Sequence, residues 1–370
     1  MGPAGSSEKK QFNRSRIARF ILKNGAASKP EIASALNLSM PTVLQNVKEL
    51  TEAGVIREAG EYQSTGGRKA KTLSVVAESR YAAGIDITAN QVSFVLIDLK
   101  GNVVHQKRSR LAYEHSLSYY QSVRDNLDLF IREIKADTGK ILGTGISLPG
   151  IIHKSTATLV KSHILNVENI SLQVLSQYFD QEPAYENDAS AAAMAELRYQ
   201  SGNAVYLSLS STVGGAIYIG RELYPGDHFR SAEFGHLLLI PGGKTCYCGK
   251  KGCVDAYCSA RVLAEHGGSL EAFFQSLEAK EPSALDVWNR YMDDLAVTVS
   301  NLRMSFDCDI VLGGYVGAFL EPYRAELGHR VQQYNRFDRD SSYVRVCRYA
   351  REASAVGVAL TFVERYLDTI

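Results

Sequence analysis

The sequence predicts an α/β protein with an N-terminal winged helix-turn-helix followed by a two-lobed α/β body. Two observations predict it: a run of short helices and a hairpin in the first eighty residues, and a strand-turn-strand pattern that occurs twice afterwards. With 370 residues, 45% of them apolar, the chain can bury several cores. It has no apolar run of about 18 residues and no apolar leader, so we expect a cytoplasmic protein without membrane contact.

Charge is divided unevenly along the chain. Residues 1–80 hold 13 Lys and Arg against 7 Asp and Glu, whereas the remaining residues hold 28 against 33. A basic head suits a module that binds DNA, because phosphate neutralisation and counterion release supply most non-specific affinity. Charge alone would fit a solvated basic surface equally well.

Three helical segments are predicted in the head. Asn13–Asn24 carries an apolar stripe, and Gly25 ends it. The sequence Ser28-Lys-Pro-Glu31 has the form of a capping box and opens a helix that runs through Leu36. Ser39-Met-Pro-Thr42 opens a third helix, which ends near Ala53. Two short helices this close together predict a helix-turn-helix.

The third helix is the expected DNA-reading helix. Val43, Val47 and Leu50 would face the core, which leaves polar side chains exposed on the other side. An ordinary solvated helix face is the alternative. The residues of this region that we expect to contact DNA are Ser39, Thr42, Gln45, Asn46 and Lys48.

The segment after these helices predicts a wing. Val55–Glu58 and Lys71–Val76 have the composition of short strands and flank a glycine-rich tip. Gly67 would let the backbone approach a groove, while Arg68 and Lys69 would enter the minor groove or hold phosphates. A flexible linker to the body is the alternative for this tip.

The body repeats one pattern. The first copy consists of strands Ala82–Ile87, Val92–Asp98 and Val103–Arg108 and a helix at about Ser116–Ala136. The second copy consists of strands Val205–Ser210 and Gly215–Ile219 and a strand beginning at Leu223. Such a duplication suggests two lobes around a ligand-binding cleft. We expect domains at 1–78, 79–187 and 188–370, with the C-terminal helix able to pack back on the first lobe.

Five motifs follow one another in the body: Ile146-Ser-Leu-Pro-Gly150, Glu186-Asn-Asp-Ala-Ser-Ala-Ala-Ala193, Ala232-Glu-Phe-Gly-His236, Cys246-Tyr-Cys-Gly-Lys-Lys-Gly-Cys253 and Ile310-Val-Leu-Gly-Gly314. In this order, behind a winged helix, they resemble the ROK family (repressors, open reading frames and kinases) over nearly the whole chain. The resemblance implies an actin-like fold of the sugar kinase/RNase H-like kind, with a sugar bound between the lobes.

The cysteine motif predicts a metal site. Cys246, Cys248 and Cys253, with His236 ten residues earlier, offer thiolates and an imidazole that suit a closed tetrahedral Zn²⁺ site. Four protein ligands leave no open position for water, so we interpret the zinc as structural. The four positions match zinc ligands of the ROK family. Cys258 is a further candidate, which we interpret as a buried apolar residue.

The resemblance also implies sugar contacts. Asn187 and Asp188 would hold sugar hydroxyls, with Glu233 and His236 contributing from the next motif. Asp255 stands where the family usually has Glu, so its side chain would reach the sugar from one methylene further away. Taken singly and without the family match, Asp86, Asp188 and Glu233 are better interpreted as solvated or helix-capping carboxylates. His163 and Asn166 lie on a segment that borders the sugar in the family.

The nucleotide-binding turns depart from the kinase pattern. In the family's kinases the residue matching Asp188 is the general base, and glycine-rich turns hold the nucleotide phosphates. Here these turns read Asp86-Ile-Thr-Ala-Asn90 and Ser210-Ser-Thr212, without the matching glycines. We therefore expect sugar binding without ATP turnover. A phosphorylated sugar would require an additional Arg or Lys in the cleft, and the sequence places none there.

These features predict a sugar-responsive transcriptional regulator that is not an enzyme. We expect it to repress genes of carbohydrate uptake or catabolism, and sugar binding to release it from its operator. Its expected partners are double-stranded operator DNA, a monosaccharide or sugar derivative, and a second copy of the chain, with a tetramer as the alternative assembly. One rival is a ROK sugar kinase with a DNA-binding appendage. Another is a sensor whose body docks on a protein such as a transporter component.

Overall fold

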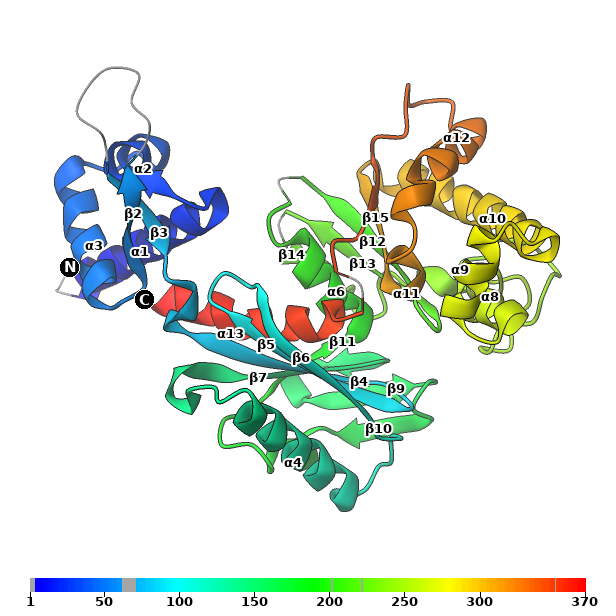
Figure 1. Ribbon diagram of the computed structural model, residues 1–370, viewed down its shortest axis with the longest axis horizontal. Helices are drawn as coiled ribbons and strands as arrows, with labels where there is room; N and C mark the ends of the chain where they lie inside the picture. Colours follow the sequence, from blue (N-terminus) through cyan, green and yellow to red (C-terminus); the bar gives the residue numbers. More distant parts are fainter. Residues whose placement is uncertain (1–3, 62–70, 201, 221, 350) are drawn as a thin grey trace.

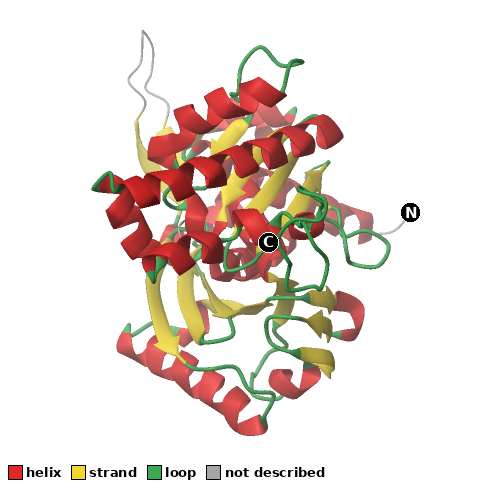
Figure 2. Cartoon of the chain, turned by 90° about the vertical axis from the view of Figure 1, so that its right-hand side faces the viewer, coloured by secondary structure: helices red, strands yellow, loops and turns green. Residues whose placement is uncertain are grey.

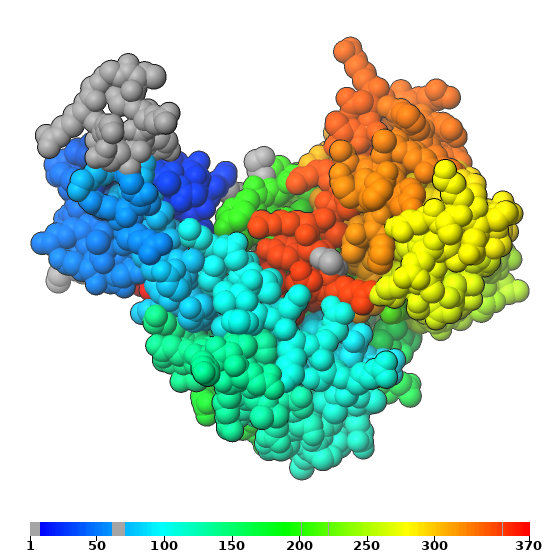
Figure 3. All heavy atoms as spheres, in the orientation of Figure 1, coloured from blue at the N-terminus to red at the C-terminus, as the bar shows by residue number. Residues whose placement is uncertain are grey.

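The computed structural model describes residues 4–61, 71–200, 202–220, 222–349 and 351–370. The chain folds into a small N-terminal head and a two-lobed body that mixes helices and sheets, so the predicted fold class is confirmed (Figure 1). The space-filling view shows the head and the second lobe on opposite sides of the molecule, with the surface hollowed between them (Figure 3). Across these described ranges, no helix has the length and apolar character needed to cross a membrane.

The head has the predicted winged helix-turn-helix order. Its elements are α1 (Ala4–Asn24), β1 (Ala27–Ser28), α2 (Lys29–Leu36), α3 (Met40–Glu52), β2 (Ile56–Glu61) and β3 (Lys71–Val75). The capping box of α2 is present: Ser28 Oγ accepts from the Glu31 amide at 3.4 Å, and Glu31 Oε2 accepts from the Ser28 amide at 2.7 Å. Helix α1 begins nine residues before the predicted start, because its first turns are mostly polar and carry no apolar stripe that would reveal a helix.

The first lobe is built on a mixed sheet in the order β11-β7-β4-β5-β6. Its elements are β4 (Tyr81–Ile87), β5 (Gln91–Asp98), β6 (Val103–Arg110), α4 (Leu117–Glu133), β7 (Ile141–Leu148), β8 (Ile151–His153), β9 (Thr158–Ser162), β10 (Val167–Ser171), α5 (Gln173–Ser176) and β11 (Ala184–Asn187). Helix α6 (Asp188–Leu197) follows β11 and packs on strands of both lobes. Helix α4 covers the outer face of this sheet, at the bottom of Figure 2. The small sheet β10-β9-β8 extends the lobe beside the cleft.

The second lobe repeats this plan, with the sheet order β14-β13-β12-β15-β16. Its elements are β12 (Ala204–Leu209), β13 (Val213–Ile219), β14 (Glu222–Leu223), α7 (Asp255–Cys258), α8 (Ala260–Gly267), α9 (Leu270–Glu278), α10 (Pro282–Phe306), β15 (Asp309–Gly313), α11 (Gly314–Gly317), α12 (Arg324–Tyr334) and β16 (Val344–Val346). In each lobe the first strand pairs antiparallel with the second strand and parallel with a later one. The predicted duplication is therefore confirmed.

The C-terminal helix α13 (Ala353–Thr369) returns to the first lobe, where it packs on β4, β5, β7 and α6. Glycines permit this close packing: a Cβ at Gly84 would lie 1.9 Å from the Ala355 carbonyl oxygen, and one at Gly145 would lie 2.3 Å from that of Val358. The other end of α13 contacts α1 of the head (Figure 1). One helix therefore links the body to the head.

Candidate functional site

Helix α3 carries the candidate DNA-reading face. Ser39 caps the helix, since its Oγ accepts from the Thr42 amide at 3.4 Å and lies 2.8 Å from Thr42 Oγ1. Gln45 and Lys48 are exposed on the following turns. Lys48 Nζ lies 3.8 Å from Glu52 Oε1. Because an exposed ion pair of this kind is weak, the lysine can exchange Glu52 for a phosphate group. These side chains lie where the sequence predicts them.

The exposure predicted for Asn46 is wrong. Its side chain is 3% exposed, and its Nδ2 donates to the Thr42 carbonyl at 2.7 Å. Asn46 follows Val43 by three residues and precedes Leu50 by four, so it falls on the buried stripe of α3. Sequence reasoning also missed Leu44, which is 47% exposed on the same helix and offers an apolar contact for a thymine methyl group.

The wing is described at its base. Strands β2 and β3 pair antiparallel from Ile56 opposite Val75 to Glu61 opposite Lys71. The predicted tip contacts Gly67, Arg68 and Lys69 lie outside the described residues.

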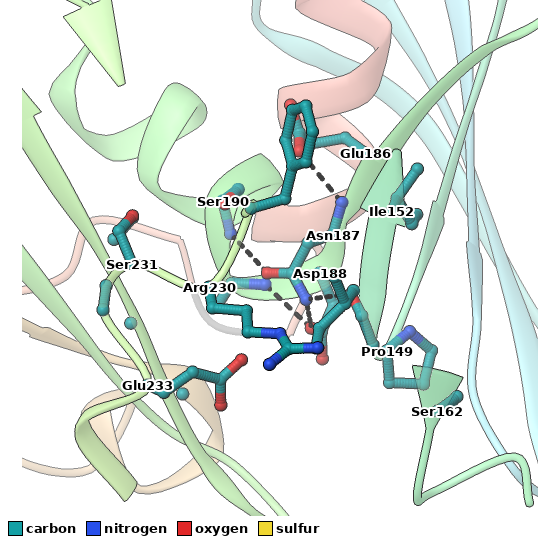
Figure 4. A pocket seen from close by; sticks show the side chains of 18 of the residues that line it. Pro149, Ile152, Ser162, Glu186, Asn187, Asp188, Ser190, Arg230, Ser231 and Glu233 are labelled. Atoms are coloured by element: carbon teal, nitrogen blue, oxygen red, sulfur yellow. Dashed lines mark hydrogen bonds between the residues drawn. The ribbon is translucent and has the colours of Figure 1, made fainter. Parts of the chain in front are cut away.

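A cavity of about 510 Å³ lies between the lobes at the N-terminal end of α6 (Figure 4). We call it the sugar pocket, after the contacts that the family resemblance predicts there. Asn187, Asp188, Glu233 and His236, all predicted as sugar contacts, line it. Its other lining includes backbone at Gly150 and at Gly214 and Gly215, where a Cβ on Gly215 would lie 2.3 Å from the Phe234 ring.

The carboxylate of Asp188 is held in place by its neighbours. Asn187 caps α6 through its Oδ1, which accepts from the Ser190 amide at 3.0 Å, while its Nδ2 donates to Asp188 Oδ1 at 3.0 Å. The Ala189 amide donates to the same oxygen at 2.9 Å. Among the described residues, Asp188 Oδ2 has no hydrogen-bond donor. One oxygen thus fixes the group, and the other is available to a ligand hydroxyl.

Arg230 faces these carboxyl groups from the second lobe. Its guanidinium points between Asp188 and Glu233 in Figure 4. Burial raises the pKa of Asp188. Burial and the negative charge of Asp188 raise the pKa of Glu233, and the positive charge of Arg230 opposes this shift. From the sequence, no cation was placed in the cleft, but Arg230, Lys154 and Lys161 line the pocket. The position of Arg230 three residues before Glu233 was the available clue.

The expectation for Asp255 is corrected by the structure. Asp255 is 0% exposed and does not line the sugar pocket. Its Oδ1 accepts from the Val213 amide at 2.7 Å, and its Oδ2 accepts from Arg261 at 2.8 Å. The shorter side chain therefore supports the pocket wall at Val213 from behind. Of the two bordering residues proposed from the sequence, His163 lines the pocket and Asn166 does not.

His236, Cys246, Cys248 and Cys253 form a cluster beside the pocket, with one ligand atom of each within 4.8 Å of the others. His236 Nδ1 lies 3.8 Å from Cys246 Sγ, and the Cys248 and Cys253 sulfurs are also 3.8 Å apart. Zn–S bonds of about 2.3 Å place tetrahedral ligands about 3.8 Å apart, so the donor set fits such an ion.

The second imidazole nitrogen of His236 faces away from the cysteines. Its Nε2 lies 3.1 Å from the Tyr247 hydroxyl, and both residues line the sugar pocket. The histidine therefore connects the cluster to the pocket wall. Cys258 is fully buried, and its sulfur lies 3.9 Å from Thr298 Oγ1, as its interpretation as a core residue requires.

Comparisons with known proteins agree with this arrangement. A family model described as "ROK family" matches residues 82–365, and a model described as "Winged helix-turn-helix DNA-binding" matches residues 13–57. The chain is 25% identical over 379 residues to a xylose repressor of Bacillus spizizenii, covering 98% of this chain and 97% of that protein.

Solved structures show the same fold. A ROK family transcriptional regulator, a homologue of the Escherichia coli Mlc protein, superposes with a TM-score of 0.74 at 20% identity over 98% of this chain and 97% of the other. A ROK hexokinase from Thermus thermophilus superposes with a TM-score of 0.62 at 23% identity, over 76% of this chain and 97% of the other. The part that matches the kinase excludes about a quarter of the chain.

Proposed function

Since the chain belongs to the ROK family and carries a winged helix-turn-helix head, we propose that it is a sugar-responsive DNA-binding transcriptional regulator, a repressor released from its operator by a sugar. The sugar binds in the sugar pocket, where Asn187 ends β11 of the first lobe, Asp188 begins α6, and Glu233 comes from the second lobe. Carboxylate and amide groups suit vicinal hydroxyls because each can pair with more than one of them.

The observation that carries this proposal is the placement of helix α6 between the pocket and the head. Its first residue is Asp188, and Arg198 caps its other end. Arg198 Nε donates to Glu364 Oε1 of α13 at 2.8 Å, and the same carboxylate forms an ion pair with Arg19 of α1. Arg19 also donates to Asp368 at 2.7 Å. We call Arg19, Arg198, Glu364 and Asp368 the head network.

Release then follows from differential binding. A sugar that contacts both Asp188 and Glu233 binds best when the lobes are closed, so it shifts the population toward closed lobes. Closure shifts α6, which packs on β12 and β13 of the second lobe as well as on β7 and β11 of the first, and the head network transmits this displacement to α1. The coupling between sugar and DNA is reciprocal. If the sugar weakens operator binding, the protein bound to its operator must bind the sugar more weakly than the free protein does.

The residues of the nucleotide side support loss of kinase activity. The turn between β4 and β5 has Thr88-Ala-Asn90 and the turn between β12 and β13 has Ser210-Ser-Thr212, so neither offers glycine amides to phosphates. The kinases among the matching structures share the fold. Asp188 then acts as a hydroxyl acceptor and no longer as a base for phosphoryl transfer.

The cofactor that we propose is a structural zinc ion on His236, Cys246, Cys248 and Cys253. Once bound, zinc would hold the loop of residues 236–253 beside the sugar pocket. We also propose a homodimer, because winged-helix regulators that read two half-sites place one head on each. Light scattering of the purified protein measures this assembly directly.

Operator binding in the presence of sugars tests the proposal. DNA fragments are first selected from a random duplex library with the full-length protein, and affinity is then measured by fluorescence anisotropy with xylose, glucose and N-acetylglucosamine and their phosphorylated forms. We expect one of them to weaken DNA binding by about five- to 150-fold, the usual range of allosteric coupling. An affinity that stays constant at saturating concentrations of all of them, or a failure to select DNA, would contradict the proposal.

A further inference from the structure

A second cavity, of about 210 Å³, lies at the junction of the two lobes. We call it the junction pocket. It shares no lining residue with the sugar pocket, and both lobes contribute to it. The residues that line it are Asp86, Gln91, Ser93, Arg108, Ser211, Ala260, Arg261, Ala264, Leu270, Glu271, Tyr315 and Arg351. Three guanidinium groups line this small cavity beside the carboxyl groups of Asp86 and Glu271. Two of the three have carboxylate partners, and Arg108 is the one without such a partner among the described residues.

The first lobe supplies a polar row that crosses its sheet. Asp86 of β4 is paired with Ser93 of β5, and Ser93 is paired with Arg108 of β6. Paired residues of neighbouring strands share a face, so the row leads toward the junction pocket. Ser147 Oγ donates to Asp86 Oδ1 at 2.6 Å. Within the described part of the chain, Arg108 has neither a hydrogen bond nor an ion pair.

The other arginines come from different elements. Arg261, in the first turn of α8, donates to Asp255 at 2.8 Å, and Arg351, just before α13, forms an ion pair with Glu271 at the start of α9. Burial and the positive charge of Arg108 lower the pKa of Arg351, so these guanidinium groups are close enough to repel each other. The N-terminal residues of α8 and α9 also line the cavity, and helix N-termini favour negative charge.

We propose that the junction pocket binds a compact tetrahedral oxyanion, either inorganic phosphate or the phosphoryl group of a small metabolite. Arg108 of the first lobe, Arg261 of the second and Arg351 at the start of α13 hold it, with hydroxyl donors from Ser93 and Ser211. Guanidinium groups suit this ligand because their paired N–H groups match two oxygens of a phosphate. The anion bridges the lobes, and the inference does not depend on the proposed sugar response.

The junction pocket also has a direct structural link to the sugar pocket. Arg261 contacts Asp255 Oδ2, and Asp255 Oδ1 holds the amide of Val213, which lines the sugar pocket. An anion that draws Arg261 toward itself changes the support of that wall. The oxyanion would therefore act as a second input to the same cleft.

Thermal unfolding of the full-length protein without sugar tests the proposal. Sodium phosphate, sodium sulfate, glucose 6-phosphate and ATP–Mg²⁺ are each titrated against sodium chloride at constant ionic strength. We expect a saturable rise in Tm with phosphate or glucose 6-phosphate. Saturation by phosphate identifies the free ion, and saturation by glucose 6-phosphate alone identifies a phosphoryl group on a metabolite. Both results support the oxyanion site.

The variant Arg108→Gln locates the binding. Arg108 is exposed and lacks an ion pair in the described residues, so its replacement removes charge without removing core packing. We expect its apparent Kd for the anion to rise about ten- to hundredfold, the loss of one charge-assisted contact. Arg110→Gln is the matched control, because Arg110 lies two residues further along β6 and does not line the pocket.

Three outcomes would overturn the proposal. One is a Tm that rises no further with phosphate or glucose 6-phosphate than with chloride. The second is an equal loss of affinity in Arg108→Gln and Arg110→Gln, which would place the anion elsewhere. The third is tighter binding of ATP–Mg²⁺ than of either compact anion, which would assign the pocket to a nucleotide.

Discussion

The sugar pocket and the junction pocket both lie between the two lobes, but they differ in the residues that line them. The sugar pocket has the polar pair Asn187 and Asp188, Glu233, and the glycines that let its walls approach. The junction pocket lies beside turns that lack the phosphate-binding glycines, and arginines line it instead. Under the proposed function, the difference means that recognition of a sugar and transfer of a phosphoryl group depend on separable parts of this fold. A regulator can keep the first while the second changes.

The largest expected effect is that of zinc, on which stability and sugar binding should both depend. Removing zinc by a chelator, or replacing Cys246 by Ser, should lower Tm by about ten degrees or more, because a structural zinc site contributes folding free energy directly. Sugar affinity should fall with it, since His236 belongs to both the cluster and the sugar pocket. Differential scanning calorimetry and metal analysis measure these changes. Cys308→Ser is the control, because Cys308 does not belong to the cluster. Equal losses of Tm in Cys246→Ser and Cys308→Ser would contradict the zinc assignment.

The next effect concerns the sugar pocket alone. Asp188→Asn should weaken sugar binding about ten- to hundredfold, because an amide oxygen accepts a hydrogen bond from a hydroxyl group less strongly than a carboxylate oxygen does. The variant should still bind DNA and the junction anion, since Asp188 lines the sugar pocket and does not line the junction pocket. Isothermal titration with the effector sugar and anisotropy with DNA are the measurements. Unchanged sugar affinity would show that the ligand binds elsewhere.

The sequence predicted the fold more completely than the site, for reasons visible in particular residues. Capping residues and apolar periodicity located α2 and α3, since these signals are local. Motifs located Asn187 and Asp188 for the same reason. Asp255 was misplaced because its partners, Val213 and Arg261, approach it only in the folded chain.

The arginines of the junction pocket lay beyond sequence reasoning, although the turns that carry its Asp86 and Ser211 were identified from the sequence. Arg108, Arg261 and Arg351 are far apart along the chain and belong to no shared motif, and only the packing of the lobes brings them together. Arg230 is an intermediate case, because it stands next to a recognised motif but gains its meaning from facing Asp188 across the cleft. Clusters assembled from both lobes are therefore the least predictable part of this protein.

A smaller effect concerns the buried carboxyl group of the junction pocket and its dependence on pH. Burial raises the pKa of Asp86 from 3.8 to about 7. Between these values the unfolded chain loses the proton and the folded chain keeps it, so stability falls as pH rises through this window and the penalty is complete above it. Asp86→Asn removes the penalty.

The Tm of Asp86→Asn minus that of the wild type should therefore grow by a few degrees from about pH 4 to about pH 8. Thermal unfolding across this range, in buffers free of phosphate, measures the difference. Asp125→Asn, on the outer helix α4, should give no such trend, since this carboxylate is exposed. Parallel pH curves for wild type and Asp86→Asn would show that the folded protein ionises Asp86 at ordinary pH.

The smallest expected effect tests whether the head network couples sugar binding to DNA binding. Arg198→Gln removes the ion pair between α6 and Glu364 without touching either pocket's ligand-binding groups. We expect sugar and DNA each to bind with nearly wild-type affinity when measured alone, while the effect of sugar on the DNA affinity falls by about fivefold, at the lower end of allosteric coupling energies. Arg132→Gln, exposed on α4, should leave the effect intact. If Arg198→Gln retains the full sugar effect, the displacement of α6 reaches the head by another route, and the packing of α13 on α1 becomes the element to alter next.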